Sequence, residues 1–167
     1  MRRVVLACVV VLALPGTAAA ATSARSGSAT ASAGGGTAEL SNGRITRAWS
    51  TSDGVVTTTL RRGKKGRNWS SGHSPDFTLT LDSVPTSSVS GWTLTGVRAR
   101  QEPTDPARPD RMRGVQLVFD YELDPAGLIT LERTYTLRSG ASAIGVSSVL
   151  HNGSPAPCAS GRTRWTS

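Results

Sequence analysis

The sequence predicts an all-β protein built as an antiparallel β-sandwich. Short runs of β-branched and aromatic residues alternate with turn residues about every ten to fifteen positions. Beyond the first twenty residues, no segment shows the 3.6-residue apolar period over the roughly ten to twelve positions that a helix needs. Strands without helices bury their apolar faces by packing one sheet on another, and this favours the sandwich.

Residues 1–20 are expected to form a secretory signal peptide. "MRR" is basic, "VVLACVVVLALPG" is apolar, and "TAAAA" offers a cleavage site of the A-x-A type near Ala20. The apolar run is shorter than the about 20 residues that span a bilayer. We therefore expect a secreted, extracellular protein without a stable membrane anchor. A lipoprotein cleavage site at Cys8 is the less favoured alternative, because few apolar residues precede that cysteine.

Composition divides the rest of the chain into three parts. Residues 21–36 contain no bulky apolar side chain, which predicts a flexible linker because little surface can be buried to offset the entropy of ordering. The β-sandwich domain is expected over 37–152. Beyond it the sequence becomes rich in Pro, Ala, Ser, Gly and Arg, which predicts a disordered tail over 153–167.

Seven or eight strands are expected in the domain. Each is bounded by Gly, Pro, Asn, Asp or Ser residues, which favour turns. Trp92 and Leu94 share a face, but the alternation shifts at Gly96, where a β-bulge would return Val97 to the apolar side. The expected strands are 37–40, 44–50, 55–62, 76–82, 91–100, 115–123, 128–138 and 142–152.

Segments 115–123 and 128–138 form the clearest pair. The first alternates apolar and polar residues, as a strand with one buried face does. Between the two lies the sequence Asp-Pro-Ala-Gly at 124–127, with proline and glycine at the positions that a type I turn favours. The sequence therefore predicts a β-hairpin.

Arg133 interrupts the apolar face of the second hairpin strand. Alternate residues of a strand share a face, so Arg133 falls in a row with leucines and Tyr135. A buried, unpaired guanidinium is costly, so Arg133 must be paired or reach water along its stem. Asp120 and Glu122 on the neighbouring strand face the other way. We expect a partner on another strand, such as Glu39, or beyond this chain, and we expect Arg133 and Tyr135 to be structural residues.

The charge pattern argues against a nucleic-acid partner. The formal net charge is +8, and basic residues concentrate in 61–67 and 98–113. Neither segment interleaves aromatic residues as single-stranded nucleic-acid sites do, so both are expected to be solvated turns. No phosphate-binding or dinucleotide-binding fingerprint occurs. His73, His151 and Cys158 lack metal-ligand spacing, so we expect neither a cofactor nor a metal.

The residues alone identify no catalytic group. A glycosidase needs two carboxylates that converge across a cleft, whereas most acidic residues here fall in expected turns or on outward faces of strands. No G-x-S-x-G nucleophile motif is present. Catalytic site residues are therefore predicted to be none, and enzyme activity stays open.

The tryptophans divide into core and surface candidates. Trp49 and Trp92 begin or end apolar faces, so both are expected in the core. Trp69 follows a loop and precedes polar residues, so it is the aromatic most expected at the surface. A sugar-stacking platform is the alternative role for these rings.

Several phrases, taken in order, resemble the N-terminal β-supersandwich of secreted glycoside hydrolases of the α-galactosidase and raffinose-synthase group (family-36-like). They are "ELSNGRITRAWS", "GVVTTTLRR", "DFTLTLD", "GVQLVFDYEL" and "LITLERTYTLRSGASAIGVSSVLHN". In that group an Asn-Gly turn, here Asn42-Gly43, precedes an arginine-rich strand. A hairpin then carries L-x-R-x-Y-x-L, here 131–137, and the next strand ends in Asn, here Asn152. The similarity covers 37–152, and galactose-mutarotase-like folds share it.

The resemblance implies a parent enzyme that hydrolyses terminal α-galactosides with retention, through two aspartates in a barrel that follows the sandwich. No position here matches those aspartates. We therefore expect a non-catalytic, incomplete sandwich domain from a chain truncated or frameshifted before the barrel. Its expected partners are the barrel or a galactoside-containing glycan, with Trp69 and His73 as candidate carbohydrate contacts. A free-standing secreted carbohydrate-binding or adhesion module is the alternative, and a complete small hydrolase is a third hypothesis.

Overall fold

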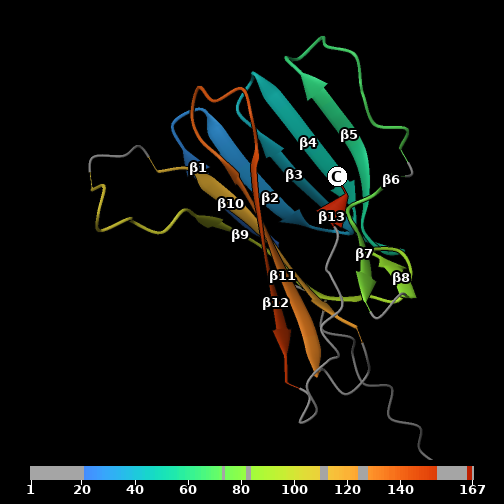
Figure 1. The fold of residues 1–167 in the computed structure, drawn as a ribbon. Helices are drawn as coiled ribbons and strands as arrows, with labels where there is room; N and C mark the ends of the chain where they lie inside the picture. The colour runs from blue at the N-terminus through green and yellow to red at the C-terminus, as the bar shows by residue number, and fades with distance from the viewer. Residues whose placement is uncertain are drawn as a thin grey trace, which may run out of the picture.

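The protein is an all-β, antiparallel β-sandwich (Figure 1). The computed structural model describes residues 21–72, 74–81, 84–109, 113–123, 128–153 and 165–166. Thirteen strands lie within these residues, in three sheets. The expected signal peptide at 1–20 lies outside the described residues, as does most of the tail expected over 153–167.

The largest sheet is a six-stranded meander in which each strand pairs with the next along the chain. Tight turns connect the first strands, and Gly35 and Gly36 adopt φ of 58° and 75°, a region that favours glycine. The strands are β1 (Thr22–Ser26), β2 (Ala29–Gly34), β3 (Thr37–Ser41), β4 (Ile45–Ser50), β5 (Val56–Arg62) and β6 (Ser74–Pro75).

The first two strands correct the prediction of a flexible linker over 21–36. Ala29, Ala31 and Ala33 alternate along β2 and are buried. They lie where β1 and β2 pack against β9 of the facing sheet. Alanine loses almost no side-chain entropy on burial, so a row of alanines can pack beneath a second sheet without bulky residues. The prediction of a linker rested on the absence of bulky apolar side chains and did not take the alternation of the alanines into account.

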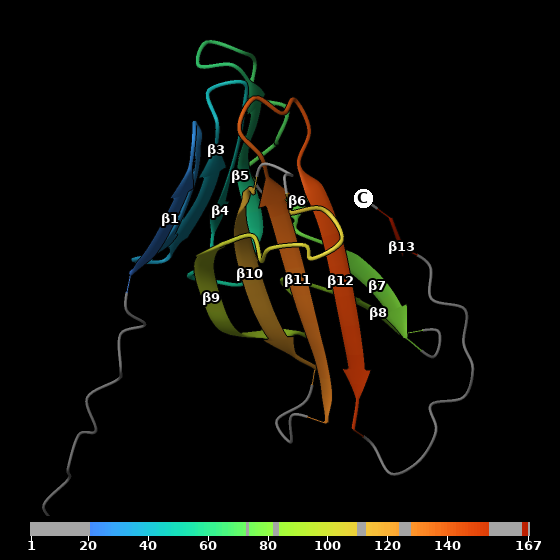
Figure 2. The ribbon, with the colours of Figure 1, turned by 90° about the vertical axis from the view of Figure 1, so that its left-hand side faces the viewer.

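Two further sheets complete the fold. A four-stranded sheet in the order β12-β11-β10-β9 faces the meander, and β7, β8 and β13 form a small third sheet (Figure 2). All eight expected strands are found within a few residues. The remaining strands are β7 (Thr78–Leu81), β8 (Val84–Ser87), β9 (Thr93–Gln101), β10 (Val115–Glu122), β11 (Ile129–Leu137), β12 (Gly145–Asn152) and β13 (Trp165–Thr166). The strand β13, which pairs with β7, was not expected in the tail.

The predicted hairpin and bulge are both confirmed. β10 and β11 pair antiparallel, with Phe119 opposite Arg133. The pairing of β10 with β9 shifts after Asp120, which lies opposite Gly96, so that Thr95 is the additional residue. The shift leaves Val97 packed against the core, as expected. The turn at 124–127 lies outside the described residues.

Aromatic rings fill the space between the sheets. The ring centroid of Trp49 lies 4.9 Å from that of Tyr135 and 5.4 Å from that of Phe119. Trp49 and Trp92 are 1% and 5% exposed, which confirms their expected place in the core. In the part of the chain that the structure describes, no helix is long and apolar enough to cross a membrane.

Candidate functional site

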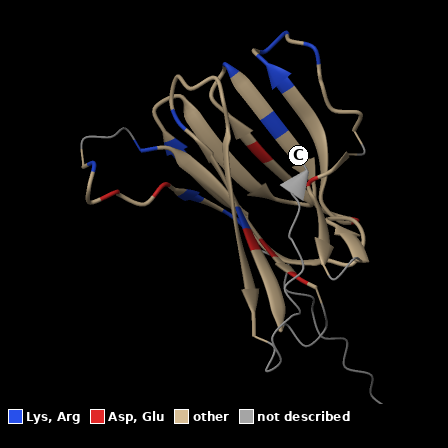
Figure 3. Cartoon of the chain, viewed as in Figure 1, with Lys and Arg blue, Asp and Glu red and all other residues tan. Residues whose placement is uncertain are grey.

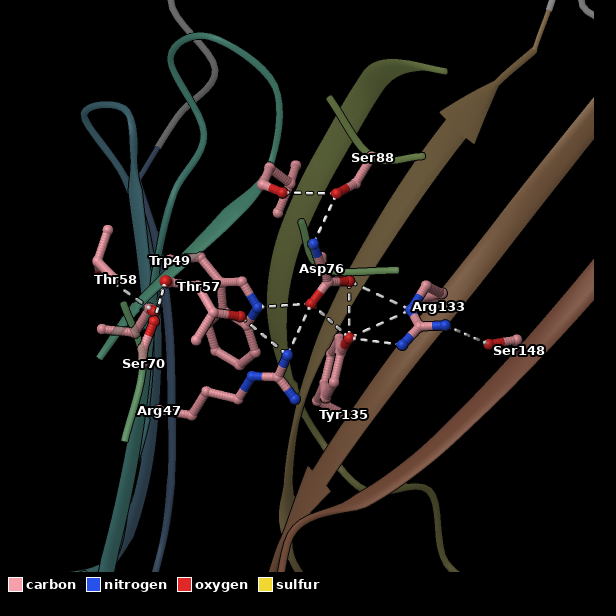
Figure 4. Close-up of polar contacts among 12 residues, drawn as sticks. Arg47, Trp49, Thr57, Thr58, Ser70, Asp76, Ser88, Arg133, Tyr135 and Ser148 are labelled. Carbon is pink, nitrogen blue, oxygen red and sulfur yellow. Dashed lines mark hydrogen bonds and ion pairs between the residues drawn. The ribbon is translucent and has the colours of Figure 1, made fainter. Parts of the chain in front are cut away.

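A buried aspartate lies between the two large sheets. Asp76 follows β6 and precedes β7, where the chain leaves the meander for the small sheet. Its side chain is 0% exposed. The backbone N–H of Asp76 is shared between the carbonyl oxygen of Val55, at 3.1 Å, and Ser88 Oγ, at 2.7 Å. These bonds fix the direction in which the carboxylate points (Figure 4).

Four side chains from the two large sheets surround this carboxylate. From β4, Arg47 Nη2 and Trp49 Nε1 donate to Asp76 Oδ1 over 3.0 and 2.8 Å. From β11, the Tyr135 hydroxyl lies 2.6 Å from both carboxylate oxygens and donates to one of them. Arg133 Nε lies 3.2 Å from Asp76 Oδ2. We call these five residues the Asp76 cluster.

The partner of Arg133 differs from the one suggested by the sequence. Arg133 is 8% exposed and paired, as its structural role requires, but the carboxylate is Asp76. Glu39 lies exposed on β3. The sequence had placed Asp76 at the start of a strand expected over 76–82, where it would alternate with Phe77. The backbone at Asp76 and Phe77 is not in a strand, so both side chains turn inward and both are buried.

Besides Asp76, Arg47 is a residue of the cluster that sequence reasoning missed. The signal was present, because Ile45, Arg47 and Trp49 alternate along β4 in the same way as the residues around Arg133. The guanidinium carbon of Arg47 lies 4.9 Å from the ring centroid of Trp49 and 4.8 Å from that of Tyr135. Arg47 Nη2 also donates to Thr57 Oγ1 over 2.9 Å. Two members of the cluster, Arg47 and Arg133, could therefore be recognised in the sequence as arginines within apolar rows.

Burial controls the protonation of the residues around Asp76. Burial raises the pKa of Tyr135 well above its ordinary value, and the negative charge of Asp76 raises it further. The pKa of Tyr121 is raised for the same two reasons, in the same order. Burial by itself lowers the pKa of Arg133, but its interactions with Tyr135 and Asp76 outweigh that effect, and the net shift is upward. At neutral pH both tyrosines are protonated and Arg133 is charged.

A pocket of about 540 Å³ opens beside the cluster. Arg47, Asp76 and Arg133 line its charged side, and Thr57 and Val146 are among the remaining lining residues. The pairing of β4 with β5 shifts between Ala48 and Trp49, which leaves an extra residue in β5. Strict alternation would place the β5 side chains that line the pocket on opposite faces of the strand. The bulge brings them to the same pocket.

The expected carbohydrate contact Trp69 lies at the surface, 58% exposed. The preceding Asn68 holds this segment against β5, because its Oδ1 accepts from Leu60 N over 2.8 Å and its Nδ2 donates to Thr58 O over 3.0 Å. The next residue, Ser70, lines the pocket, so Trp69 lies beside the rim and not among the lining residues. His73 lies outside the described residues.

The fold and the site define an antiparallel β-sandwich whose sheets are joined by a buried aspartate-arginine cluster. No protein family, no curated protein and no solved structure matches this chain. Within the described residues, no group of three or more His, Cys, Asp or Glu side chains is placed to hold a metal ion.

Proposed function

We propose that this chain is a non-catalytic β-sandwich module of a secreted glycoside hydrolase that acts on α-galactosides. The main support for this proposal is the environment of the phrase L-x-R-x-Y-x-L at 131–137. Its arginine and tyrosine point into the sandwich and hold Asp76, which is a structural use of both residues. The other phrases of the resemblance fall on strands in the same chain order, from β3 to β12.

The chemistry of the pocket supports a non-catalytic role. A retaining glycosidase places two carboxyl groups about 5–5.5 Å apart, one as nucleophile and one as acid. Among the described residues the lining has a single carboxylate, Asp76, whose oxygens are already engaged by the four other members of the Asp76 cluster. Attack by this carboxylate on a sugar would first require those interactions to break.

Carboxylates elsewhere pair with arginines across strands. Asp120 and Glu132 both bind Arg98, and Glu102 binds Arg138. The Arg98–Asp120 pair joins the neighbouring strands β9 and β10, and the Arg98–Glu132 pair reaches across β10 to β11. The Glu102–Arg138 pair ties the loop after β9 to the end of β11. Such pairing suits a scaffold whose surface is fixed in shape.

The module would support a catalytic barrel and present its rim to a galactoside-containing glycan. Trp69 is suited to contact sugar because an exposed indole offers a flat apolar face. The same exposed ring favours the alternative, a free-standing carbohydrate-binding or adhesion module. The two proposals differ in whether the chain binds glycans in isolation.

Nitrophenol release and glycan binding test these proposals. The purified chain should release no nitrophenol from nitrophenyl α-galactoside above the buffer rate. Turnover that survives repurification and disappears in Asp76→Asn would overturn the non-catalytic assignment. On a glycan array, binding by the isolated chain that is lost in Trp69→Ala and retained in Val84→Ala, which removes another exposed apolar side chain, would favour the free-standing module.

A further inference from the structure

We propose that the pocket beside Asp76 binds a carboxylate, with a uronic acid as the class of ligand that fits it. This inference goes beyond the galactosidase-module proposal: the carboxylate part does not depend on that proposal, and the sugar part rests on it. It starts from the charge of the pocket. Arg47 and Arg133 both line it, whereas Asp76 is the only carboxylate that the described residues contribute to its lining, so these residues give the charged wall a formal excess of one positive charge.

That excess charge is poorly solvated. The side chains of Arg47 and Arg133 are 18% and 9% exposed. Arg47 Nε is buried and has no hydrogen-bond partner among the described residues. A buried donor without an acceptor is destabilising, and a cation held away from water attracts anions more strongly than a solvated one. An anion in the pocket would offset that excess charge.

Further donors lie around the same space. The Thr57 hydroxyl accepts from Arg47 Nη2, so its own proton can be donated to a ligand oxygen. Arg133 Nη1 makes only a long bond of 3.3 Å, to Ser148 Oγ. Leu60 and Val146 supply apolar walls. With a volume of about 540 Å³, the pocket falls in the size range of small-molecule sites, about 300–1,000 Å³.

The size of the excess charge favours a carboxylate over a phosphate. A carboxylate carries one negative charge and matches the planar fork of a guanidinium. A phosphate monoester carries about −1.5 to −2 at neutral pH. One excess positive charge therefore balances the carboxylate and leaves a phosphate under-neutralised.

The loop that reaches the pocket begins with a basic turn. The chain between β5 and β6 begins with Lys64, Lys65 and Arg67 and reaches the pocket at Ser70, and Figure 3 shows positive charge gathered at this end of the meander. Clustered charge of one sign raises the local concentration of oppositely charged ligands. An acidic glycan chain would find its uronate carboxylate in the pocket and further positive charge along the turn.

Calorimetric titration of the purified full chain tests the proposal. Sodium galacturonate is the probe, galactose is its neutral counterpart, and acetate and inorganic phosphate separate the carboxylate from the sugar and from other anions. We expect galacturonate to bind at least tenfold more tightly than galactose and to weaken as salt is added. We also expect acetate to compete with it. Equal binding of galactose and galacturonate, or tighter binding of phosphate, would overturn the proposal.

Two sites on β12 provide matched variants. Val146 lines the pocket and is 49% exposed, whereas Val149 is 62% exposed on the same strand and is not among the lining residues. Val146→Glu places a competing carboxylate at the pocket and should lower galacturonate affinity at least tenfold. Val146→Gln and Val149→Glu should leave affinity within about twofold. Equal losses in the two glutamate variants would show that binding occurs elsewhere. If galacturonate bound no more tightly than galactose, the proposed role of the module toward neutral galactosides would be unaffected.

Discussion

The side chain of Asp76 is buried from solvent, and the residues that bind its carboxylate come from strands on opposite sheets. Arg47 and Trp49 reach it from β4, and Arg133 and Tyr135 reach it from β11. A buried charge that loses one partner is destabilised far more than an exposed pair that is broken. The two kinds of pair can be compared directly in this protein.

Arg133→Leu should lower the free energy of unfolding by about 3 kcal/mol, because it removes one of the two cations paired with buried Asp76 and leaves the Tyr135 hydroxyl without its Arg133 donor. Urea denaturation followed by circular dichroism measures the loss. Arg98→Leu is the control, since Arg98 binds Asp120 and Glu132 with its side chain 40% exposed, and its loss should cost less than about 1 kcal/mol. Equal costs for the two variants would contradict the structural role of the Asp76 cluster.

The two tyrosines of the chain, Tyr121 and Tyr135, are both buried with raised pKa values. The folded state keeps phenol protons that the unfolded state releases above about pH 10. The free energy of unfolding should therefore be unaffected by these groups below pH 9 and should fall as the pH rises past 10. Phenolate absorbance should appear only as the circular dichroism of the fold is lost. In guanidinium chloride the same chain should titrate near pH 10. Phenolate formed at pH 10 in the folded protein would contradict the burial of these hydroxyls.

At the residue scale, the sequence predicted the buried arginine of the site but not the carboxylate that pairs with it. The apolar row around Arg133 revealed a charge that needed a partner, and the matching row around Arg47 carried the same information. The inward position of Asp76 could not be predicted from the sequence, because period-2 alternation applies to strands and the chain bends at this residue. Which carboxylate meets which arginine depends on how two sheets pack, and local patterns do not encode that.

Small residues give the β1–β2 hairpin its place in the sandwich. Ala31 is 2% exposed and pairs with Ala24 and Leu40 on its neighbours, while Ser32 next to it is exposed. Thr22 Oγ1 accepts a hydrogen bond of 2.8 Å from Ala99 N of β9. The hairpin therefore belongs to the folded unit.

Ala31→Asp should destabilise the protein by at least about 2 kcal/mol, because it puts a charge between the sheets without a partner. Ser32→Asp introduces the same side chain one position along and should change stability by no more than about 0.5 kcal/mol. Thermal denaturation of both variants makes the comparison. A flexible segment would tolerate the two substitutions equally, and that result would contradict the observed packing.

Strands were predicted correctly where their alternating side chains are large, and they were missed where these side chains are small. Where Val, Leu, Phe and Tyr alternate, as in β10, the strand, its partner and its inward face were all predicted. β1 and β2 were missed because Ala, Ser and Thr give the same alternation with little contrast in hydropathy. The bulge at Gly96 was predicted because aromatic and aliphatic neighbours made the shift of register visible.

On the scale of the whole molecule, β12 is a strand whose residues are mostly exposed. It is the last strand in the order of its sheet among the described residues, and Val146, Val149 and Leu150 on it are 49%, 62% and 37% exposed. An apolar edge strand is a template for pairing with another chain. A partner module or a second copy would shield this edge.

The isolated chain should self-associate as its concentration rises. Light scattering during size-exclusion chromatography should show a mass above that of the monomer, and Val149→Lys should shift the equilibrium toward monomer because a lysine opposes edge pairing. Val89→Lys adds the same charge at a 44% exposed site outside β12 and should have no such effect. A monomer at all concentrations, or equal responses to the two lysines, would rule out association through β12.

The sequence distances within the Asp76 cluster bear on the rates of folding and unfolding. Asp76 lies 29 positions from Arg47 and 59 from Tyr135, so its bonds form only after distant parts of the chain have met. Non-local contacts of this kind slow folding. Interactions that form after the transition state act almost wholly on the unfolding rate. We therefore expect the Asp76 cluster to lengthen the lifetime of the native state, and the indole proton of Trp49 to exchange with solvent deuterium only when the whole sandwich opens.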